Sequence, residues 1–360
     1  MTRRIMPGLL ALFLLIAGSA SAQTVRPPEN AGAVRPEAAD PATTGRIERQ
    51  RYDNHADFWR QVREGDRGSQ ASPTAGRGMM IQSAGEGWRN LRNGPYVRWS
   101  GYLLLGVLGL LALFFALRGR IRVVSGYSGY ELRRFRFAER FTHWLTATSF
   151  VVLALTGLNL VFGRALLIPL IGKEAFAAFA AWGKVAHDYV SFAFMLGVVL
   201  MFLLWVRQNI PNRHDFLWLV RAGGFLGGGH APAKKFNAGQ KLLFWAVILF
   251  GVSVSLSGVQ LLYPYKFAFF EGTFAFLNHL PGVDLPTALS PINEQQLANL
   301  WHGIIAVLFT AVIFGHIYIG SVGMEGGFSA MGSGRVDLNW AREHHDLWVE
   351  DLQKVEAQPR

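Results

Sequence analysis

The 360-residue sequence contains no cysteine and few charged residues. Without cysteine the chain can form no disulfide, hold no thiolate-ligated iron–sulfur cluster and attach no c-type haem covalently. Any redox centre must use other ligands, and the ten histidines are the obvious supply. Charged residues make up 16% of the chain, whereas soluble domains average about one quarter. With hydrophobic residues at 51%, this deficit indicates a membrane protein.

The formal net charge of +11 has a simpler explanation than nucleic-acid binding, and no nucleic-acid partner is expected. Lys and Arg cluster beside apolar segments, where they set the orientation of membrane spans. A spanning helix needs about 20 apolar residues. Five segments meet this requirement: residues 99–117, 144–163, 185–206, 242–263 and 298–320. The sequence therefore predicts an all-α membrane protein, a four-helix transmembrane bundle preceded by one extra N-terminal transmembrane helix at 99–117.

The first 22 residues have the pattern of a secretory signal peptide. Two arginines are followed by the apolar run PGLLALFLLIAG and by the small-residue cleavage site Ala20-Ser21-Ala22. Cleavage there leaves the mature N-terminus on the periplasmic side, and an uncleaved anchor is the alternative. Residues 23–98, rich in Arg, Ala, Pro and Gly, then form a periplasmic N-terminal segment.

The distribution of basic residues agrees with this orientation. With the mature N-terminus outside, the cytoplasmic connections are residues 118–143, 207–241 and 321–360, and the first two are rich in Arg and Lys. The outer connections contain far fewer basic residues. An excess of Lys and Arg on the cytoplasmic side is the usual pattern in membrane proteins. The protein is expected in the bacterial inner membrane, embedded in lipid, with a cytoplasmic C-terminus.

Four histidines lie at or inside the predicted spans. An imidazole in hydrocarbon is costly, so an intramembrane histidine is by default a functional candidate. Their predicted depths form two pairs from different helices: His187 with His302 in the outer leaflet, and His143 with His316 in the inner leaflet. The other six lie in predicted loops or tails and are expected to be solvated: His55, His214, His230, His279, His344 and His345.

His302 and His316 are separated by nearly four helical turns, so both rings face one side of the helix, about 21 Å apart in height. One metal ion cannot bind both rings, but two stacked planar cofactors can. Axial ligation of two b-type haems by the two pairs fits, because neutral imidazole is a good iron ligand. Two axial histidines per iron favour electron transfer over oxygen binding. The alternatives are hydrogen-bonded interfacial histidines, or a transporter that uses them for protons or metal.

Two further features have both structural and functional interpretations. Asp188 either orients the neighbouring His187 imidazole or is simply interfacial, and the second interpretation is favoured. In FNAGQK, residues 236–241, Asn237 and Gln240 have the spacing of a helix capping box. The same two amides, at a helix start beside the inner haem, are suited to hydrogen-bond a quinone head group. The spacing favours the cap, and both roles are compatible.

Several motifs together resemble the gamma subunit of respiratory formate dehydrogenase, a membrane cytochrome b with four core helices. They lie within residues 131–352: RFRFAERFTHW, GKVAHDYV, RQNIPNRHDFLWL, FNAGQKLLFW, NLWHGIIAV, FGHIYIG and WAREHHDLWVEDL. The resemblance implies a cytochrome b core over residues 131–325 and a cytoplasmic tail over 326–360. It implies that two haems b are ligated by His143, His187, His302 and His316, and that quinone binds near Asn237, Gly239 and Gln240.

The resemblance also implies partners and a reaction. A catalytic subunit with a molybdenum or tungsten pterin cofactor oxidises formate, and an iron–sulfur subunit passes electrons to the outer haem. The inner haem then reduces quinone with protons from the cytoplasm. The cytochrome b of a nickel–iron hydrogenase or of another quinone-linked oxidoreductase is the alternative. The signal peptide, residues 23–98 and the extra span depart from the short family pattern, and IQSAGEGWRNLRNGP, residues 81–95, is similar to longer members.

Overall fold

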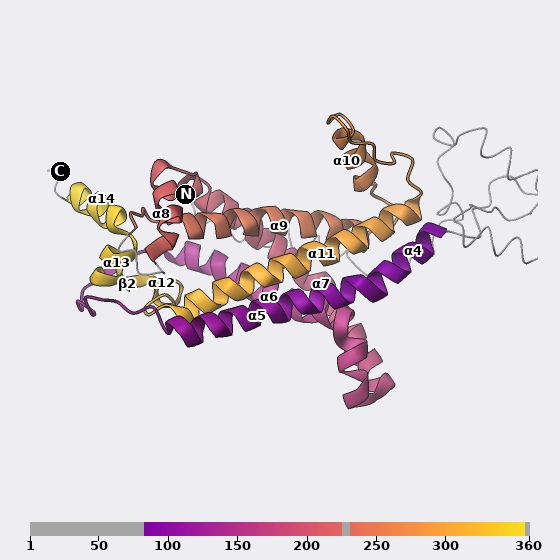
Figure 1. Ribbon diagram of the computed structural model, residues 1–360, viewed down its shortest axis with the longest axis horizontal. Helices are drawn as coiled ribbons and strands as arrows, with labels where there is room; N and C mark the ends of the chain where they lie inside the picture. The colour runs from indigo at the N-terminus through magenta and orange to yellow at the C-terminus, as the bar shows by residue number, and fades with distance from the viewer. Residues whose placement is uncertain (1–82, 225–230, 357–360) are drawn as a thin grey trace, which may run out of the picture. The chain divides into compact units, whose positions relative to one another are not determined.

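The structure is a computed structural model that describes residues 83–224 and 231–356 (Figure 1). Five helices in these ranges are long and apolar enough to cross a membrane: Gly87–Arg118, Phe137–Leu166, Ile168–Trp205, Ala238–Leu262 and Pro291–Gly323. Each contains all or nearly all of one predicted span, so the prediction of an all-α membrane protein with five spanning helices is confirmed. The predicted signal peptide and residues 23–82 lie outside the described residues.

The helix α7 (Ile168–Trp205) is much longer than the predicted span 185–206, because most of the expected outer connection is helical. The added sequence KEAFAAFAAW is rich in alanine, the strongest helix former. The helix is interrupted at Gly172, whose φ of 79° lies in the left-handed region that favours glycine. Residues 173–184 therefore extend the spanning helix instead of forming a loop.

The described residues form two compact units. The first contains residues 101–252 and the chain from residue 306 onward, and the second contains residues 83–100 and 253–305. Two helices contribute residues to both units: α9 (Ala238–Leu262) and α11 (Pro291–Tyr318). Each unit is described by itself.

In the first unit, α6 (Phe137–Leu166) and α7 pack closely along each other. A Cβ at Gly197 of α7 would overlap the hydroxyl of Thr146 and lie 3.1 Å from the Thr146 Cα, so only glycine permits this approach. The core beside this contact is aromatic. The ring of Phe309 from α11 is 2% exposed, and its centroid lies 4.7 Å from that of Phe150 and 6.2 Å from that of Phe194.

A polar assembly, here called the end-cap, consists of residues 119–136 and 324–356 and lies at one end of the first unit's helices (Figure 1). Strand β1 (Glu131–Arg133) pairs antiparallel with β2 (Arg335–Asp337). Short helices complete it: α12 (Ser329–Gly332), α13 (Leu338–His344) and α14 (Asp346–Glu356). The described part of the predicted tail 326–360 is thus folded against the segment that precedes α6.

Three carboxylates hold the loop of residues 123–129 within the end-cap. Glu325 accepts a hydrogen bond from the backbone N–H of Val123, and Glu343 accepts those of the next two residues. Asp337 accepts the N–H groups of residues 128 and 129 and also caps α13. These carboxylates supply acceptors for backbone N–H groups that no strand or helix of the described residues satisfies, and so they fix the shape of the loop.

The second unit joins three helices through one buried carboxylate. It includes α4 (Ser83–Leu91), the π-helix η2 (Arg92–Tyr96) and α10 (Phe269–Leu277). Glu294 of α11 is 2% exposed and accepts hydrogen bonds from Gln260 of α9 and from the backbone N–H groups at the start of α10. Arg92 donates to Asn299 of α11 at 3.1 Å, so the segment similar to longer family members packs on this helix.

Candidate functional site

His143 of α6 and His316 of α11, called the inner pair after their predicted leaflet, lie next to each other in the first unit. Their ring centroids are 6.0 Å apart and the ring planes are inclined by 67°. Metal–imidazole bonds of about 2 Å on both sides of one ion would place the ring centres about 6 Å apart. The spacing therefore fits one metal ion between the rings. The structure brings these two predicted residues together, and their role as haem ligands stays a prediction.

The start of α6 fixes the position of His143. The Glu139 carboxylate accepts the backbone N–H of Arg136 at 2.8 Å and pairs with Lys235 at 2.7 Å, one helical turn before the histidine. The Trp144 ring meets the imidazole edge-on, with centroids 5.2 Å apart. Within the described ranges, the Nδ1 atom of His143 is buried and has no hydrogen-bond partner. No hydrogen bond through Nδ1 to a described residue therefore orients this ring.

His187 of α7 is held by a hydroxyl group of α6. Its Nδ1 lies 2.8 Å from Thr156 Oγ1, and that hydroxyl also lies 2.8 Å from the carbonyl oxygen of Val152. A Cβ at Gly157 would lie 3.6 Å from the imidazole Cε1, in van der Waals contact. The ring therefore packs against the backbone of α6 at the Thr156-Gly157 step.

His302 of α11 has the same kind of surroundings in the second unit. Its Nδ1 lies 3.0 Å from Ser257 Oγ of α9, and Ser257 donates to the carbonyl of Ser253 at 2.9 Å. A Cβ at Gly258 would lie 3.4 Å from the imidazole Cε1. His187 and His302 belong to different units, so each is described only in its own surroundings, and their pairing stays a prediction.

Sequence reasoning did not single out Thr156 or Ser257. The signal that would have found them is a pair of similar tripeptides, Leu-Thr-Gly at 155–157 and Leu-Ser-Gly at 256–258, in the C-terminal halves of two spanning helices. A small polar residue next to glycine in a spanning helix permits a close contact with a side chain of another helix. In both places that side chain is an imidazole.

Asp188 does not take the orienting role that was one interpretation of its position. Both of its carboxylate oxygens accept hydrogen bonds from Lys184 Nζ, at 2.9 and 2.7 Å, across one turn of α7. The Lys184 side chain is 53% exposed. These contacts agree with the favoured interpretation of Asp188 as an interfacial residue.

The FNAGQK segment forms the predicted capping box. Asn237 Oδ1 accepts the backbone N–H of Gln240 at 2.9 Å, and Gln240 Oε1 accepts the N–H of Asn237 at 3.2 Å. Gln240 Oε1 also accepts a bond from Arg134 at 3.3 Å. Gly239 has a packing role, since a Cβ there would lie 2.8 Å from the Trp218 ring. The cap is present, and quinone binding by these residues stays a prediction.

Arg134 is a buried cation that sequence reasoning missed. It is 4% exposed and donates to the backbone carbonyl of Lys235 at 2.7 Å. Its guanidinium lies over the rings of Trp340 and Trp348, 5.2 and 5.6 Å from their centroids, where cation–π attraction stabilises the charge. Burial lowers the pKa of Arg134 to about 9, so the group remains charged at neutral pH. It joins FNAGQK to the end-cap.

His345 contradicts the expectation that the loop and tail histidines are solvated. Its side chain is 1% exposed, and its Nδ1 donates to the carbonyl of Lys234 at 2.7 Å. Burial lowers the pKa of His345 well below its ordinary value, with the Arg134 charge acting in the same direction. The imidazole is therefore neutral at pH 7. The expectation was wrong because the tail folds back on the protein, which the sequence pattern alone does not reveal.

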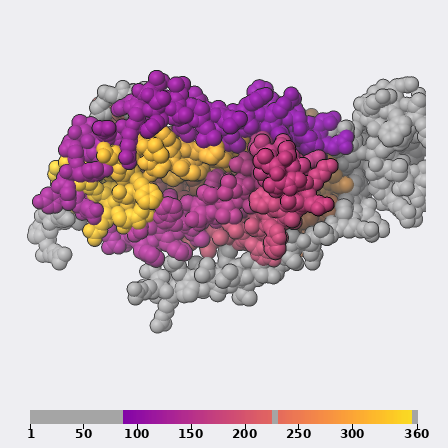
Figure 2. Space-filling model, turned by 90° about the horizontal axis from the view of Figure 1, so that it is seen from below, coloured from indigo at the N-terminus to yellow at the C-terminus, as the bar shows by residue number. Residues whose placement is uncertain are grey.

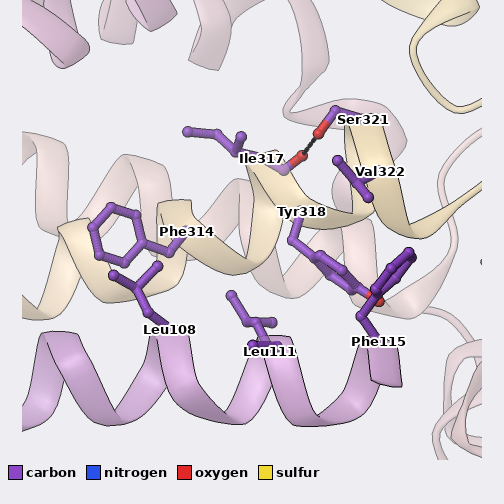
Figure 3. Close-up of a pocket in the computed structure, with 9 residues that line it drawn as sticks. Leu108, Leu111, Phe115, Phe314, Ile317, Tyr318, Ser321 and Val322 are labelled. Atoms are coloured by element: carbon purple, nitrogen blue, oxygen red, sulfur yellow. Dashed lines mark hydrogen bonds between the residues drawn. The ribbon is translucent and has the colours of Figure 1, made fainter. Parts of the chain in front are cut away.

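A cavity of about 350 Å³ lies between α5 (Val97–Arg118) and the end of α11 (Figure 3). Figure 2 shows the C-terminal part of the first unit, in yellow, between α5, in indigo, and α6, in magenta. The lining is mainly apolar, with Leu108, Leu111 and Phe115 on α5 and Phe314, Ile317 and Tyr318 on α11. None of the predicted site residues lines it. Its surface suits hydrocarbon rather than a polar substrate.

Comparison with known proteins gives the family. The family model for prokaryotic cytochrome b561 matches residues 134–334, more than half of the chain. The chain belongs to the prokaryotic cytochrome b561 family. Membership implies b-type haem and electron transport in a membrane, so the prediction of a membrane cytochrome b is confirmed.

The similar curated proteins are cytochrome b556 subunits of formate dehydrogenases. The cytochrome b556(Fdn) subunit of the nitrate-inducible formate dehydrogenase of Escherichia coli strain K12 is 25% identical over 227 residues, which cover 62% of this chain and 93% of that protein. The cytochrome b556(fdo) subunit of the same strain is 28% identical over 224 residues, with the same coverage. The formate dehydrogenase cytochrome b556 subunit of Haemophilus influenzae is 26% identical over 230 residues, covering 62% and 85%. The resemblance drawn from the sequence motifs is confirmed.

Proposed function

We propose that this cytochrome is the membrane subunit of a formate dehydrogenase complex and conducts electrons through two b-type haems to quinone. The single observation that carries the proposal is the inner pair, His143 and His316, whose ring centroids lie 6.0 Å apart on two different spanning helices. The similar formate dehydrogenase subunits support the choice of complex. The two remaining candidates, His187 and His302, would hold the outer haem.

The residues of this chain supply binding, orientation and an apolar environment. A b-type haem held by two histidines would supply reversible one-electron transfer and would leave no free ligand position for oxygen. His143 and His316 would each give one ring nitrogen to the inner iron. The rings of Phe150, Phe194 and Phe309 fill the core of the same unit and exclude water from it. A dry, apolar bundle of this kind is typical of cofactor sites between helices.

The FNAGQK segment is proposed to bind the quinone head group. Asn237 and Gln240 both use their side-chain oxygens in the cap, so the donor that each offers to a quinone carbonyl is its amide nitrogen. Gly239 acts indirectly by leaving room for Trp218. Arg134 holds the Gln240 oxygen from the other side and so helps to orient this amide. Quinone would thus bind close to the end-cap.

The proposed partners are an iron–sulfur subunit and a catalytic subunit with a molybdenum or tungsten pterin cofactor. The cysteine-free chain cannot hold iron–sulfur clusters, so the electrons it carries must arrive from another subunit. The excess of basic residues in connections 118–143 and 207–241 supports a cytoplasmic position for FNAGQK and the end-cap. The outer haem would then face the periplasmic partners in the bacterial inner membrane.

Purification of the complex with its partners tests the proposal. Formate should reduce a b-type α-band, and quinone should reoxidise it. His187→Ala should abolish electron entry, whereas Asn237→Ala should keep both haems and mainly slow quinone turnover. Activity with hydrogen alone would assign the chain to a hydrogenase instead. A complex with no b-type band would exclude electron transfer and favour transport by intramembrane histidines.

A further inference from the structure

We propose that two hydroxyl–glycine steps, Thr156-Gly157 and Ser257-Gly258, select the metal-binding nitrogen of His187 and His302 and lower the reduction potential of the outer haem. The inference rests on the proposed function, because it takes these two histidines as the outer ligands. Thr156 and Ser257 are positioning residues that act through the imidazoles and not on the iron itself.

The hydrogen-bond donors and acceptors determine the tautomer of each imidazole. The Thr156 hydroxyl lies 2.8 Å from the Val152 carbonyl, and a carbonyl oxygen can only accept. The single hydroxyl hydrogen is therefore donated to the backbone, and Oγ1 is left as the acceptor toward His187 Nδ1 at 2.8 Å. Nδ1 carries the hydrogen, so Nε2 holds the lone pair that binds a metal.

The same deduction applies to His302 in the second unit. Ser257 Oγ donates to the Ser253 carbonyl at 2.9 Å, so it accepts from His302 Nδ1 at 3.0 Å. Again Nε2 keeps the lone pair. Two histidines on different helices thus share one arrangement, in which a serine or threonine bonded to the preceding turn of its own helix fixes the ring.

The glycine after each hydroxyl residue allows the imidazole to lie against the helix backbone. A Cβ at Gly157 would lie 3.6 Å from the His187 Cε1, and a Cβ at Gly258 would lie 3.4 Å from the His302 Cε1. Cε1 is the ring carbon between the two nitrogens. A side chain larger than alanine at either glycine would therefore push against Cε1 and tilt the imidazole ring.

An accepted Nδ1–H bond changes the electronic character of the ligand. Withdrawal of the hydrogen toward the hydroxyl oxygen increases negative charge on the ring, which makes Nε2 a more basic ligand. A more basic axial ligand stabilises the oxidised iron and lowers the reduction potential. His143 of the inner pair differs, since within the described ranges its buried Nδ1 has no hydrogen-bond partner. The difference favours electron flow from the outer to the inner haem.

Removal of either hydroxyl should act in the same direction. Ser257→Ala and Thr156→Val each take away the oxygen that accepts the Nδ1–H bond of one outer histidine.

Redox titration of the α-bands in the purified complex tests the proposal. Ser257→Ala should shift one of the two haem components to a higher midpoint potential, and Thr156→Val should shift the same component in the same direction. Ser257→Thr, which restores the hydroxyl, should titrate like the wild type. Thr310→Val is the matched control, because the buried Thr310 hydroxyl makes the same bond to its preceding turn, to Ala306 at 2.7 Å. It should leave both components unchanged.

The outcomes separate this inference from the proposed function. Unchanged potentials in Ser257→Ala and Thr156→Val, with both haems bound, would overturn the inference alone. Retention of both haem components in His187→Ala would overturn the proposed ligation itself. If Ser257→Ala does not assemble, Thr156→Val decides, because it tests the same kind of hydroxyl–imidazole contact at the other histidine. An upward shift then supports the proposal, and no shift overturns it.

Discussion

The spanning helices and the end-cap satisfy their polar groups in different ways. In the described spanning helices, hydroxyls such as that of Thr156 bond to carbonyls of their own helix and to imidazoles. The end-cap instead uses ionised groups. Glu343 and Asp337 accept backbone N–H groups, and the Arg134 guanidinium is buried among aromatic rings.

Because of this difference, the two regions should respond to different changes in the protein or its solution. Neutral hydroxyl–imidazole contacts in hydrocarbon avoid the cost of a buried charge and leave the histidine nitrogen available for a metal. Carboxylates in the end-cap gain stronger, charge-assisted hydrogen bonds, but they lose them when they are protonated. The spanning region should therefore respond to changes in the haem ligands and the end-cap to changes in pH.

The largest expected effect is the loss of a haem component when a histidine of the spanning region is replaced by alanine, compared with the same replacement in the end-cap. His143→Ala should remove one of the two haem components completely, because the inner pair would lose one ligand. His345→Ala should keep both components and destabilise the end-cap by about 1–3 kcal/mol, since it leaves the Lys234 carbonyl without its donor. Difference spectra and thermal unfolding of the two variants measure these effects. Loss of haem in both variants would contradict the separation of the regions.

Packing in the spanning region gives the next largest effect. Gly197→Ala should destabilise the α6–α7 contact by about 1–3 kcal/mol, because the new Cβ overlaps Thr146. Gly106→Ala on α5 is the control, since a Cβ there meets nothing within 4 Å. Thermal inactivation in detergent compares the two. Equal stability of both variants would show that α6 and α7 do not depend on this close approach.

The pH dependence should appear in the end-cap. Burial alone would raise the pKa of Asp337 and of Glu343, but hydrogen bonds from residues 124–129 and from the start of α13 outweigh it and lower both. A lowered pKa in the folded protein gives stability that is present above the unfolded-state value, about 4, and is lost as pH falls through the folded-state value. The protection of the amides of loop 123–129 against hydrogen exchange, relative to their intrinsic exchange rates at each pH, should therefore fall as pH drops below about 4.

The variant Glu343→Gln tests the contribution of one carboxylate to this pH dependence. Glu343→Gln should weaken the loop at pH 7 by about 1 kcal/mol, because an uncharged amide is a poorer acceptor. It should also reduce the loss of amide protection between pH 7 and pH 3, after correction for intrinsic exchange. A loop whose exchange follows the wild-type pH curve in Glu343→Gln would mean that this carboxylate does not hold it.

The smallest expected effect is at the Lys184–Asp188 ion pair of α7, in which the lysine side chain is 53% exposed. Lys184→Ala should change stability by less than about 0.5 kcal/mol, because pairs one helical turn apart with a solvent-exposed lysine contribute little. It should leave the haem potentials unchanged, because Thr156 rather than Asp188 contacts the His187 imidazole. A shifted haem potential in Lys184→Ala would show that Asp188 does orient the His187 imidazole.

Much of this architecture is predictable from the sequence because membrane spans are encoded locally. Long apolar runs and basic flanks indicate the five helices, and histidines within such runs are conspicuous. The extension of α7 was missed because residues 173–184 carry charges, although KEAFAAFAAW has strong helix propensity. Hydrophobicity indicates where a span crosses but not where its helix ends.

The contacts that define the site's details were not predictable, because they depend on tertiary neighbours. Ser257 and Thr156 are ordinary small residues until an imidazole from another helix packs on them. His345 looks like a solvated tail residue, and only the fold of the end-cap buries it. The capping box of Asn237 and Gln240 was predictable, because its two partners lie three residues apart on the chain.

The central claim is that histidines from separate helices ligate two haems in pairs. Haem content and redox titration of four single alanine variants test it most directly: His143→Ala, His316→Ala, His187→Ala and His302→Ala. The first two variants should lose one and the same haem component, and the last two should lose the other. If the variants of the inner pair lost different components, or if any of the four kept both haems, the account would be contradicted.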